Sequence, residues 1–489
     1  MSLVHQQLVS KVRGRLELTR WPVVRALLRQ RLLNWALMTL ALLGFAVAIL
    51  AGLIGTAVGS ANFGIVFVWI VWWGLFMCVL LPLGGRVWCL ICPIPAPGEW
   101  VQRGALVCPP VAGGNGLPPA IGSLDRPSSG IPFTLGWRWP ARLRSIWLQN
   151  FGFLGVALFS TVILTQPWVT GWALLGFLVG ALGLALLFER RAFCRYVCPV
   201  GGFIGLYSLA APLELRVKDP VVCQNHLTKE CYLGSASGYG CPWSEQPWRM
   251  DRNAYCGLCG ECLRTCPKGN VAVSLRVPGM DLLVAHGWRL DEAYKAFIML
   301  ACAAIYPVVL LGPWGWLKSW ADLAWLPGFG LYAAAFLAVN LFGVPGVHLG
   351  ITALVRQAKI LREVPLWRLF VALAYPLVPI GLAAWLAFTL SFVFANLSYA
   401  LPVLSDPLGW GWNLLGTGDL SWRPWLAGWV PWMQVTVLLV GLMMSIKTAD
   451  AILRSFTGGR ATVYGLVIQT TAVTAEALFF LWLYLGASA

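Results

Sequence analysis

The sequence predicts an all-α polytopic membrane protein with about nine transmembrane helices and one inserted, cysteine-rich polar module. Two observations support this fold class. First, 59% of the 489 residues are hydrophobic, only 11% are charged and the mean hydropathy is +0.73, so the chain is far more apolar than soluble domains. Second, apolar stretches long enough to cross a hydrocarbon core of about 30 Å recur along the whole chain.

Nine of these stretches are expected to form transmembrane helices. The seventh contains Pro376 and Pro379, and proline removes a helical hydrogen bond, so this span is expected to be kinked. The nine predicted spans are residues 33–58, 62–82, 146–165, 168–188, 296–313, 327–354, 369–397, 425–446 and 462–486.

Basic residues predict the orientation of the spans, because Lys and Arg are retained on the cytoplasmic side. With the amino terminus inside, only Lys318 and Arg423 of the 35 Lys and Arg residues fall outside. We therefore expect a multi-pass protein of the cytoplasmic (inner) membrane. The net charge of +16 then reflects topology and attraction to anionic membrane lipids or to an acidic redox partner, and nucleic acid is not expected as a partner.

The chain begins with a basic cytoplasmic segment, residues 1–32, which precedes an apolar run without a small-residue cleavage site. It is therefore not expected to be a cleaved secretory signal. An amphipathic helix lying on the inner leaflet is the expected structure.

Residues 33–188 form two transmembrane hairpins, and a paired-cysteine motif ending in Cys-Pro follows each hairpin. The first motif is Cys89-Leu-Ile-Cys92-Pro, and the second, at the start of the next segment, is Cys194-Arg-Tyr-Val-Cys198-Pro. This arrangement indicates an internal repeat that can bring four thiols together at the inner face. Four interpretations stay open: one additional metal or cluster site, a redox-active dithiol, a disulfide, or simple inheritance of the motif.

Residues 189–294 form the longest polar segment and hold nine of the fourteen cysteines. Its strongest motif is Cys256-x2-Cys259-x2-Cys262-x3-Cys266-Pro, which is the ligand run of bacterial ferredoxins. Three thiolates of such a run share one 4Fe-4S cluster and the fourth serves a second cluster. Structural zinc also takes four cysteines, but in two separated knuckles, so the spacing favours iron and sulfur. Gly257 and Gly260 are expected to let the backbone approach the inorganic sulfides closely.

The second cluster would use cysteines that lie earlier in the segment. By the ferredoxin crossover, Cys241, which precedes a proline, completes the cluster of the main run, while Cys223 and Cys231 join Cys266. One ligand is then missing. His226 is one candidate, Cys194 or Cys198 is another, and His226 can equally be a solvated loop residue.

These motifs resemble those of the membrane-integral polyferredoxins of the NapH, NosR and CcoG type, over about residues 33–280. The resemblance implies a protein of the cytoplasmic membrane with two 4Fe-4S clusters on the cytoplasmic side. It also implies electron transfer between the quinone pool and a partner, or assistance in metalloenzyme assembly. The first Cys-Pro pair here is one residue shorter than the family pattern, the earlier ferredoxin motif is stretched, and five further helices (residues 295–489) follow.

Glu476 is the most unusual polar residue within the predicted spans. Ionisable groups are costly in a membrane, so it is a candidate proton or quinone site, and a neutral interhelical hydrogen bond is the alternative. For the chain as a whole we expect a membrane-bound electron-transfer subunit of an oxidoreductase complex. The alternatives are a maturation or redox-regulatory protein, and a membrane anchor whose clusters dock a catalytic subunit.

Overall fold

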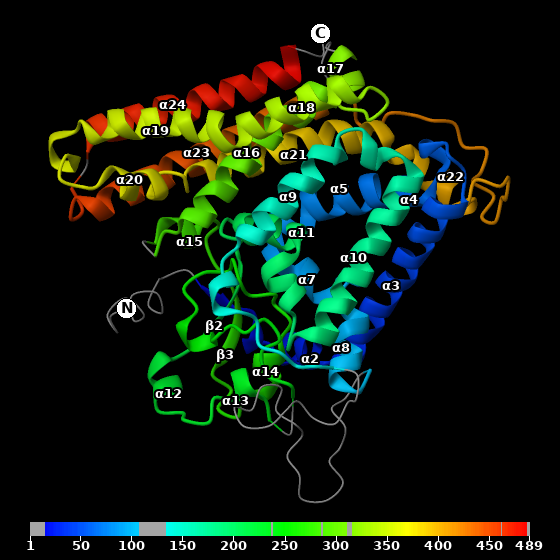
Figure 1. Cartoon of the computed structure of the whole chain (residues 1–489). Helices are drawn as coiled ribbons and strands as arrows, with labels where there is room; N and C mark the ends of the chain where they lie inside the picture. The colour runs from blue at the N-terminus through cyan, green and yellow to red at the C-terminus, as the bar shows by residue number, and fades with distance from the viewer. Residues whose placement is uncertain are drawn as a thin grey trace, which may run out of the picture. The chain divides into compact units, whose positions relative to one another are not determined.

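A computed structural model of the chain describes residues 15–106, 134–235, 238–284, 287–310, 315–460 and 462–486. These residues are mostly helical and include one small sheet of three strands (Figure 1). The chain divides into two compact units. Unit 1 comprises Met1–Ala46, Leu80–Leu148 and Leu175–Asp281, and unit 2 comprises Val47–Val79, Gln149–Leu174 and Leu282–Ala489.

The polytopic helical fold is confirmed. Within the described ranges, eight helical stretches are long and apolar enough to cross a membrane. They are Arg31–Ile54, Phe63–Ile91, Pro167–Leu187, Leu290–Leu310, Leu326–Arg356, Leu366–Ser405, Val430–Phe456 and Val463–Gly486.

These eight stretches match eight of the nine predicted spans, and the span predicted at 146–165 differs. Helix α9 (Trp147–Ser160) has 14 residues, and a separate 3-10 turn, Ile163–Thr165, follows it. At 1.5 Å per residue α9 is about 21 Å long, which is shorter than a hydrocarbon core. Apolar composition alone did not reveal this break.

The kink predicted at Pro376 is confirmed. Helix α20 (Leu366–Ala372) ends four residues before Pro376, and helix α21 (Leu377–Asn396) begins directly after Pro376. The Leu377 N–H bonds to the Ala374 carbonyl at 3.1 Å, which is the tighter three-residue pattern. Proline lacks the N–H that a continuous helix needs at this point.

The long helices of unit 2 pack side by side, with α21 against α16 and α23 and with α24 against α19 and α23 (Figure 1). Several helical stretches contain π-helical turns, including Val66–Trp72, Val339–Gly343 and Trp482–Gly486 in unit 2. The other helices of this unit are α4 (Phe63–Ile65), α5 (Trp73–Leu75), α16 (Leu290–Leu310), α17 (Gly315–Trp320), α18 (Leu326–Ala338), α19 (Val344–Arg356), α22 (Ala400–Ser405), α23 (Val430–Phe456) and α24 (Val463–Leu481).

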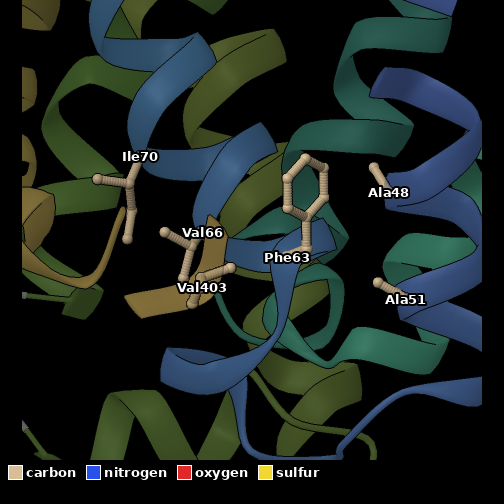
Figure 2. Close-up of a cluster of buried hydrophobic side chains, with 6 residues drawn as sticks. All are labelled: Ala48, Ala51, Phe63, Val66, Ile70 and Val403. Atoms are coloured by element: carbon tan, nitrogen blue, oxygen red, sulfur yellow. The ribbon is translucent and has the colours of Figure 1, made fainter. Parts of the chain in front are cut away.

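Asn62 organises the turn between the first two spans. Its side-chain amide donates to the carbonyls of Ala51 (2.7 Å) and Thr56 (2.9 Å), and its Oδ1 accepts from the N–H of Gly64 at 2.9 Å. It therefore caps the new helix and satisfies the end of the preceding one. The cluster of buried apolar side chains beside this turn is shown in Figure 2 and comprises Ala48, Ala51, Phe63, Val66, Ile70 and Val403.

Unit 1 contains an antiparallel sheet in the order β1-β3-β2, with β1 (Leu16–Glu17), β2 (Leu213–Val217) and β3 (Val271–Leu275). The predicted basic segment thus contributes an edge strand, and its described helix, α2 (Pro22–Arg29), is only eight residues long. Its first fourteen residues lie outside the described residues. The remaining helices of this unit are α6 (Leu81–Gly84), α7 (Trp88–Ile91), α8 (Ala96–Arg103), α11 (Pro199–Tyr207), α12 (Pro220–Gln224), α13 (Glu230–Leu233) and α14 (Glu261–Thr265). Helices α3 (Arg31–Ile54), α10 (Pro167–Leu187) and α15 (Met280–Leu283) contribute residues to both units.

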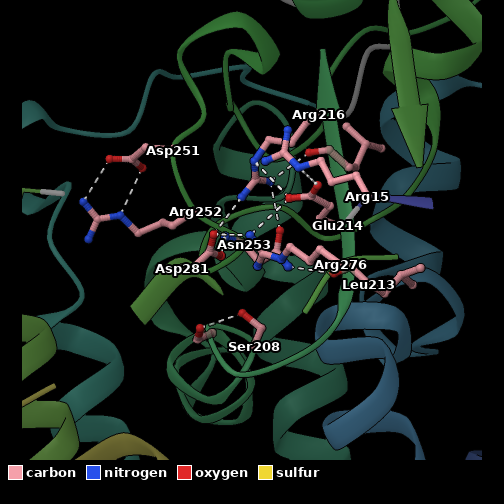
Figure 3. Close-up of polar contacts among 12 residues, drawn as sticks. Arg15, Ser208, Leu213, Glu214, Arg216, Asp251, Arg252, Asn253, Arg276 and Asp281 are labelled. Atoms are coloured by element: carbon pink, nitrogen blue, oxygen red, sulfur yellow. Dashed lines mark hydrogen bonds and ion pairs between the residues drawn. The ribbon is translucent and has the colours of Figure 1, made fainter. Parts of the chain in front are cut away.

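The two faces of β2 have different surroundings, because successive strand side chains point to opposite faces. Leu215 lies in a small apolar core, whereas Glu214 and Arg216 enter the buried ionic network shown in Figure 3. In this network Arg276 bonds Glu214 at 3.1 Å, and Arg216 bonds Asp281 at 3.2 Å.

Asp281 links this network to the cysteine-bearing loop. Its Oδ2 accepts from the backbone N–H of Asn253 at 2.7 Å, three residues before Cys256 (Figure 3). Burial would raise the pKa of Asp281, but Arg276 and Arg216 outweigh it and hold the pKa below its ordinary value. The carboxylate therefore stays ionised and fixes the start of the loop.

Candidate iron-sulfur centres

Four cysteines line one hollow in unit 1, which we call site 1. They are Cys241, Cys256, Cys259 and Cys262, the set that the ferredoxin crossover groups together. No residue that lines this hollow is exposed. The other lining residues are Leu215, Trp243, Glu245, Pro247, Met250, Gly257 and Gly260.

The loop that carries these thiols depends on two unusual backbone positions. Leu258 and Gly260 have positive φ angles of 51° and 73°, and α14 begins directly after Gly260. Gly257 also packs closely against a neighbouring side chain, because a Cβ at this position would lie 2.0 Å from Trp243 Nε1. Its missing side chain makes room for the buried indole that forms one wall of site 1.

A second hollow, which we call site 2, is lined by Cys223, Cys231, Cys266 and His226. Its wall also includes the exposed residues Val222 and Lys268, so site 2 reaches the surface of the unit. The structure thus brings His226 to the three cysteines that lacked a fourth partner. Cys194 and Cys198, the rival candidates, do not line this hollow.

Asn270 holds two of the site 2 cysteines. Its Nδ2 donates to Cys223 Sγ at 3.2 Å, and its backbone N–H donates to Cys266 Sγ at 3.4 Å. Hydrogen bonds of this kind stabilise sulfur in its ionised form. No sequence motif predicts this contact, because it depends on the fold around β3.

The imidazole of His226 is oriented by its neighbours. Its Nε2 lies 2.8 Å from a carboxylate oxygen of Glu230 and 3.0 Å from the hydroxyl of Thr228. A carboxylate beside one ring nitrogen fixes the tautomer and leaves the other nitrogen as the one that can bind a metal.

The two sites are neighbours. Cys262 of site 1 and Cys231 of site 2 belong to one apolar core together with Leu215, Leu263 and Val271. Helix α14 starts with a cysteine of site 1 in its first turn, and Cys266 of site 2 directly follows its end. Four cysteines within eleven residues are therefore divided between two adjoining hollows, as the crossover requires.

Several thiols that line sites 1 and 2 are weak acids. Burial raises the pKa of Cys256 and of Cys231 to about 12, and it raises the pKa of Cys262 well above its ordinary value. Such thiols would lose their protons on binding a metal, which couples binding to proton release.

The paired cysteines of the two repeat motifs also come together in unit 1. Burial raises the pKa of Cys194 most, and its neighbours Cys198, Cys92 and Cys89 raise the pKa further. Burial raises the pKa of Cys198 to about 11 even though the N–H of Gly201 donates to its Sγ at 3.2 Å. We call this set the four-thiol group.

Arg191 joins the four-thiol group to site 1. Its guanidinium donates to the Cys89 carbonyl at 2.9 Å and forms a buried bidentate pair with Glu99, with one contact at 2.7 Å. Burial raises the pKa of Cys259, and the charge of Arg191 acts against that increase. Some basic residues of the Cys-Pro motifs are thus buried and make structural contacts. From the sequence we interpreted them only as a topology signal.

Single metal ions need closer ligands than a cluster does, because each thiolate of a cubane binds a different iron atom. Among the residues that the structure describes, no group of three or more His, Cys, Asp or Glu side chains is placed to hold one metal ion. The cysteines of sites 1 and 2 instead surround hollows. An iron-sulfur cluster occupies the space between its ligands, so this geometry fits a cluster.

Glu476 lies in α24, and its Oε2 is buried without a hydrogen-bond partner in the described part of the chain. Gln434 in α23 behaves differently, because its amide donates to the Ala387 carbonyl at 2.9 Å and to Ser391 at 2.6 Å. The Gln434 amide therefore contributes to helix packing. The Glu476 carboxyl group makes no comparable hydrogen bond among the described residues.

Sequence reasoning did not find two ionisable residues inside the membrane-spanning stretch Leu290–Leu310. Glu292 is 2% exposed and Lys295 is fully buried. The predicted span began at residue 296, so both were assigned to the polar segment.

The fold and these sites define a class of protein: a mostly helical, multi-pass membrane protein with a 4Fe-4S binding region. Comparison with known families supports this class, because a 4Fe-4S binding domain matches residues 65–108 and 170–215. The two matches fall on the two repeat units and contain the four-thiol group, whereas the run from Cys256 to Cys266 lies outside them.

One particular relative is a protein of Escherichia coli (strain K12) named "Putative electron transport protein YccM". It is 28% identical over 115 residues, which cover 22% of this chain and 30% of the relative. The match therefore spans less than a third of either chain. No solved structure matches this protein.

Proposed function

We propose that the protein relays single electrons through two 4Fe-4S clusters held at site 1 and site 2. The observation that carries this proposal is the convergence of seven cysteines and one histidine around two adjoining hollows, four residues to each. The electron-transport relative and the 4Fe-4S binding domain support the same chemistry. A bound cubane would accept one electron at a time and pass it on.

Site 2 is the point of exchange with a soluble redox partner, because its wall reaches the surface. Leu227, next to His226, is 87% exposed, and Val222 and Lys268 are exposed within the wall itself. An apolar centre with a basic rim favours a small acidic electron carrier, since complementary charge steers encounter. Site 1, whose lining includes no exposed residue, is the inner carrier.

The other end of the relay is the quinone pool or a membrane partner. Glu476 supports a quinone, because a buried carboxyl oxygen without a partner can bind or transfer a proton inside the membrane. The distribution of Lys and Arg supports a cytoplasmic position for the clusters and the amino terminus.

Iron and sulfide analysis after anaerobic purification, combined with reductive EPR, tests the proposal. We expect about eight iron atoms per chain and two interacting paramagnetic centres on reduction. About four would contradict a cluster at site 2, and none would contradict the relay. About twelve iron atoms would indicate a third cluster, held by the four-thiol group. About eight would mean that the four-thiol cysteines hold no cluster and could instead act as thiols.

His226 has its own test. His226→Ala should remove about four iron atoms if the imidazole is a ligand, and His226→Cys should restore them. Asn225→Ala is the control, because Asn225 is an exposed neighbour that does not line site 2. Full iron content in His226→Ala would show that the residue is not a ligand.

A further inference from the structure

We propose that one face of α16 conducts protons through unit 2 to a quinone, along polar side chains that run from Glu292 and Lys295 to Tyr306. The inference depends on the quinone arm of the proposed function. Reduction of a quinone to a quinol consumes two electrons, which the clusters deliver singly, and two protons, which need a route into the membrane.

The relevant residues share a face of the helix. At 100° per residue, positions 292, 295, 302 and 306 fall within a sector of about 80°. With a rise of 1.5 Å per residue, the line from Glu292 to Tyr306 is about 21 Å long. It therefore covers about two thirds of a hydrocarbon core.

The line begins with ionisable groups at the start of α16. Arg289 bonds Asp291 at 2.6 Å, and its backbone N–H donates to the hydroxyl of Tyr375 at 3.2 Å. That hydroxyl in turn donates to the buried carboxylate of Glu292. Of these groups, the Tyr375 hydroxyl and the Glu292 carboxylate can pass a proton between them.

Lys295 is the next group, one turn further along. Its side chain is fully buried, its Nζ donates to the Gln149 carbonyl at 3.2 Å, and it lies 4.6 Å from the centre of the Phe153 ring. Charged groups in membrane spans are rare and usually mark substrate, ion or proton pathways. The two turns between Lys295 and Cys302, about 10 Å, are too long for a direct hydrogen bond, so water would carry the proton there.

Beyond this gap the polar contacts resume between α16 and its neighbours. Cys302 Sγ lies 3.5 Å from Oδ1 of Asn340, and Asn340 sits in the π-helical turn Val339–Gly343. π-Helical turns occur frequently at functional sites. Tyr306 then contacts the hydroxyl of Ser160 in α9.

The line extends past Tyr306 through the residue next to Ser160. Thr161 Oγ1 and the hydroxyl of Tyr332 are 3.2 Å apart, and both residues are buried. Pro307 adds an acceptor at this level, because it has no N–H to donate to the Ala303 carbonyl. Hydroxyl groups both donate and accept, which suits a proton relay.

Helix packing alone would explain single hydrogen bonds of this kind, as it does for Gln434. It does not require a buried glutamate and a buried lysine on the same face as a thiol and a tyrosine. The two explanations predict different behaviour when one oxygen atom is removed, since packing affects stability whereas a proton path affects the rate of proton-coupled steps.

The test uses the purified full-length protein in liposomes. Clusters are reduced photochemically and mixed with a short-chain ubiquinone or menaquinone analogue, and their reoxidation is followed by absorbance in H2O and in D2O. We expect Tyr306→Phe, Lys295→Met and Glu292→Gln to slow reoxidation at least tenfold and to increase the solvent isotope effect. Tyr294→Phe is the matched control, because Tyr294 lies on the same helix away from this face and contacts Phe297.

Iron content of each variant is measured first, so that loss of clusters is separated from loss of proton transfer. Tyr306→Phe keeps the ring that packs against Trp385 and is therefore the decisive variant. An unchanged rate and isotope effect in Tyr306→Phe would overturn the proton path and leave the electron relay standing. Failure of the wild-type protein to transfer electrons to any quinone would overturn the quinone arm and this inference together.

Discussion

Site 1 and site 2 carry the same number of ligands but differ in what surrounds them. Site 1 is enclosed by buried residues such as Trp243 and Leu215, and the Arg191 charge reaches one of its thiols. Site 2 opens at Val222 and Lys268 and uses an amide, Asn270, to hold its sulfurs. Cluster potentials depend on charge, hydrogen bonds and exposure, so two unlike surroundings would give two carriers of different potential.

The difference also follows the sequence spacing. The compact run from Cys256 places Cys256 and Cys259 on one tight loop and Cys262 in the first turn of α14, so the surrounding chain can close over them. The stretched motif brings Cys223 and Cys231 from separate short helices, α12 and α13, and leaves connecting residues at the surface. The regular motif from Cys256 thus belongs to site 1, which has no exposed lining residue. The stretched motif belongs to site 2, which reaches the surface.

The largest expected effect is the loss of one cluster at a time. Cys262 and Cys231 are equally buried, each 6% exposed, and both lie in the core that the two sites share. Cys262→Ser should remove about four iron atoms from site 1, and Cys231→Ser should remove about four from site 2, because each serves one cluster only. Iron analysis and EPR of each variant would show which signal is lost.

Cys302→Ser is the control for this pair, since Cys302 is a fully buried cysteine of unit 2 that lines neither site. It should keep all its iron. Loss of both signals in either cysteine variant would contradict the division into two independent sites and would indicate one cooperative centre.

The sequence was sufficient to predict the helical membrane fold and the grouping of cysteines, because both depend on local composition and spacing. The run from Cys256 and the Cys-Pro signal at Cys241 need no tertiary information. The contacts of Arg191, Asn270 and Lys295 do need it, since they depend on which segments pack together. The span boundary at 296 placed Lys295 outside the membrane, and no periodicity in the sequence could correct that.

A second prediction concerns the ion pair beside site 1. Burial raises the pKa of Glu99, but Arg103 and Arg191 outweigh it and lower the pKa to about 2 from an ordinary value of 4.5. The stability from this pair is therefore fully present above pH 4.5 and is lost as the pH falls towards 2. Breaking a buried pair costs about 3–5 kcal/mol, so Glu99→Gln should lower the thermal midpoint strongly at pH 7.

The same variant should also lose part of the acid dependence, because its amide does not titrate. Thermal unfolding at pH 7, 4.5 and 3 measures both effects. Glu363→Gln is the matched control, since Glu363 is exposed, and it should behave as wild type. Equal acid sensitivity of Glu99→Gln and wild type would show that other carboxylates dominate.

A third prediction separates the walls of the two sites. Gly257→Ala should disturb only site 1, because the new Cβ would meet the Trp243 indole at 2.0 Å. Overpacking of this kind costs about 1–3 kcal/mol. Iron release on warming should therefore begin at a lower temperature for the site 1 signal, while the site 2 signal keeps its wild-type profile.

Gly180→Ala is the matched control for the third prediction. Gly180 lies in α10, where a Cβ would meet nothing within 4 Å, so the same substitution should leave both signals unchanged. Equal loss of both signals in Gly257→Ala would mean that the two sites do not melt separately.

The smallest expected effect is at the open wall of site 2. Lys268 is exposed there, and reversing its charge should weaken steering of an acidic one-electron carrier without changing cluster content. Lys268→Glu should slow reduction by an acidic ferredoxin about two- to fivefold at low salt, and the difference should shrink towards high salt as charges are screened. Reduction by dithionite, a small ion, and the variant Lys359→Glu, an exposed lysine of unit 2, are the two controls. If the rate of reduction of Lys268→Glu by ferredoxin is unchanged at low salt, the docking surface does not lie at site 2. The contrast between an inner and an outer carrier would then depend only on the burial of the two sites.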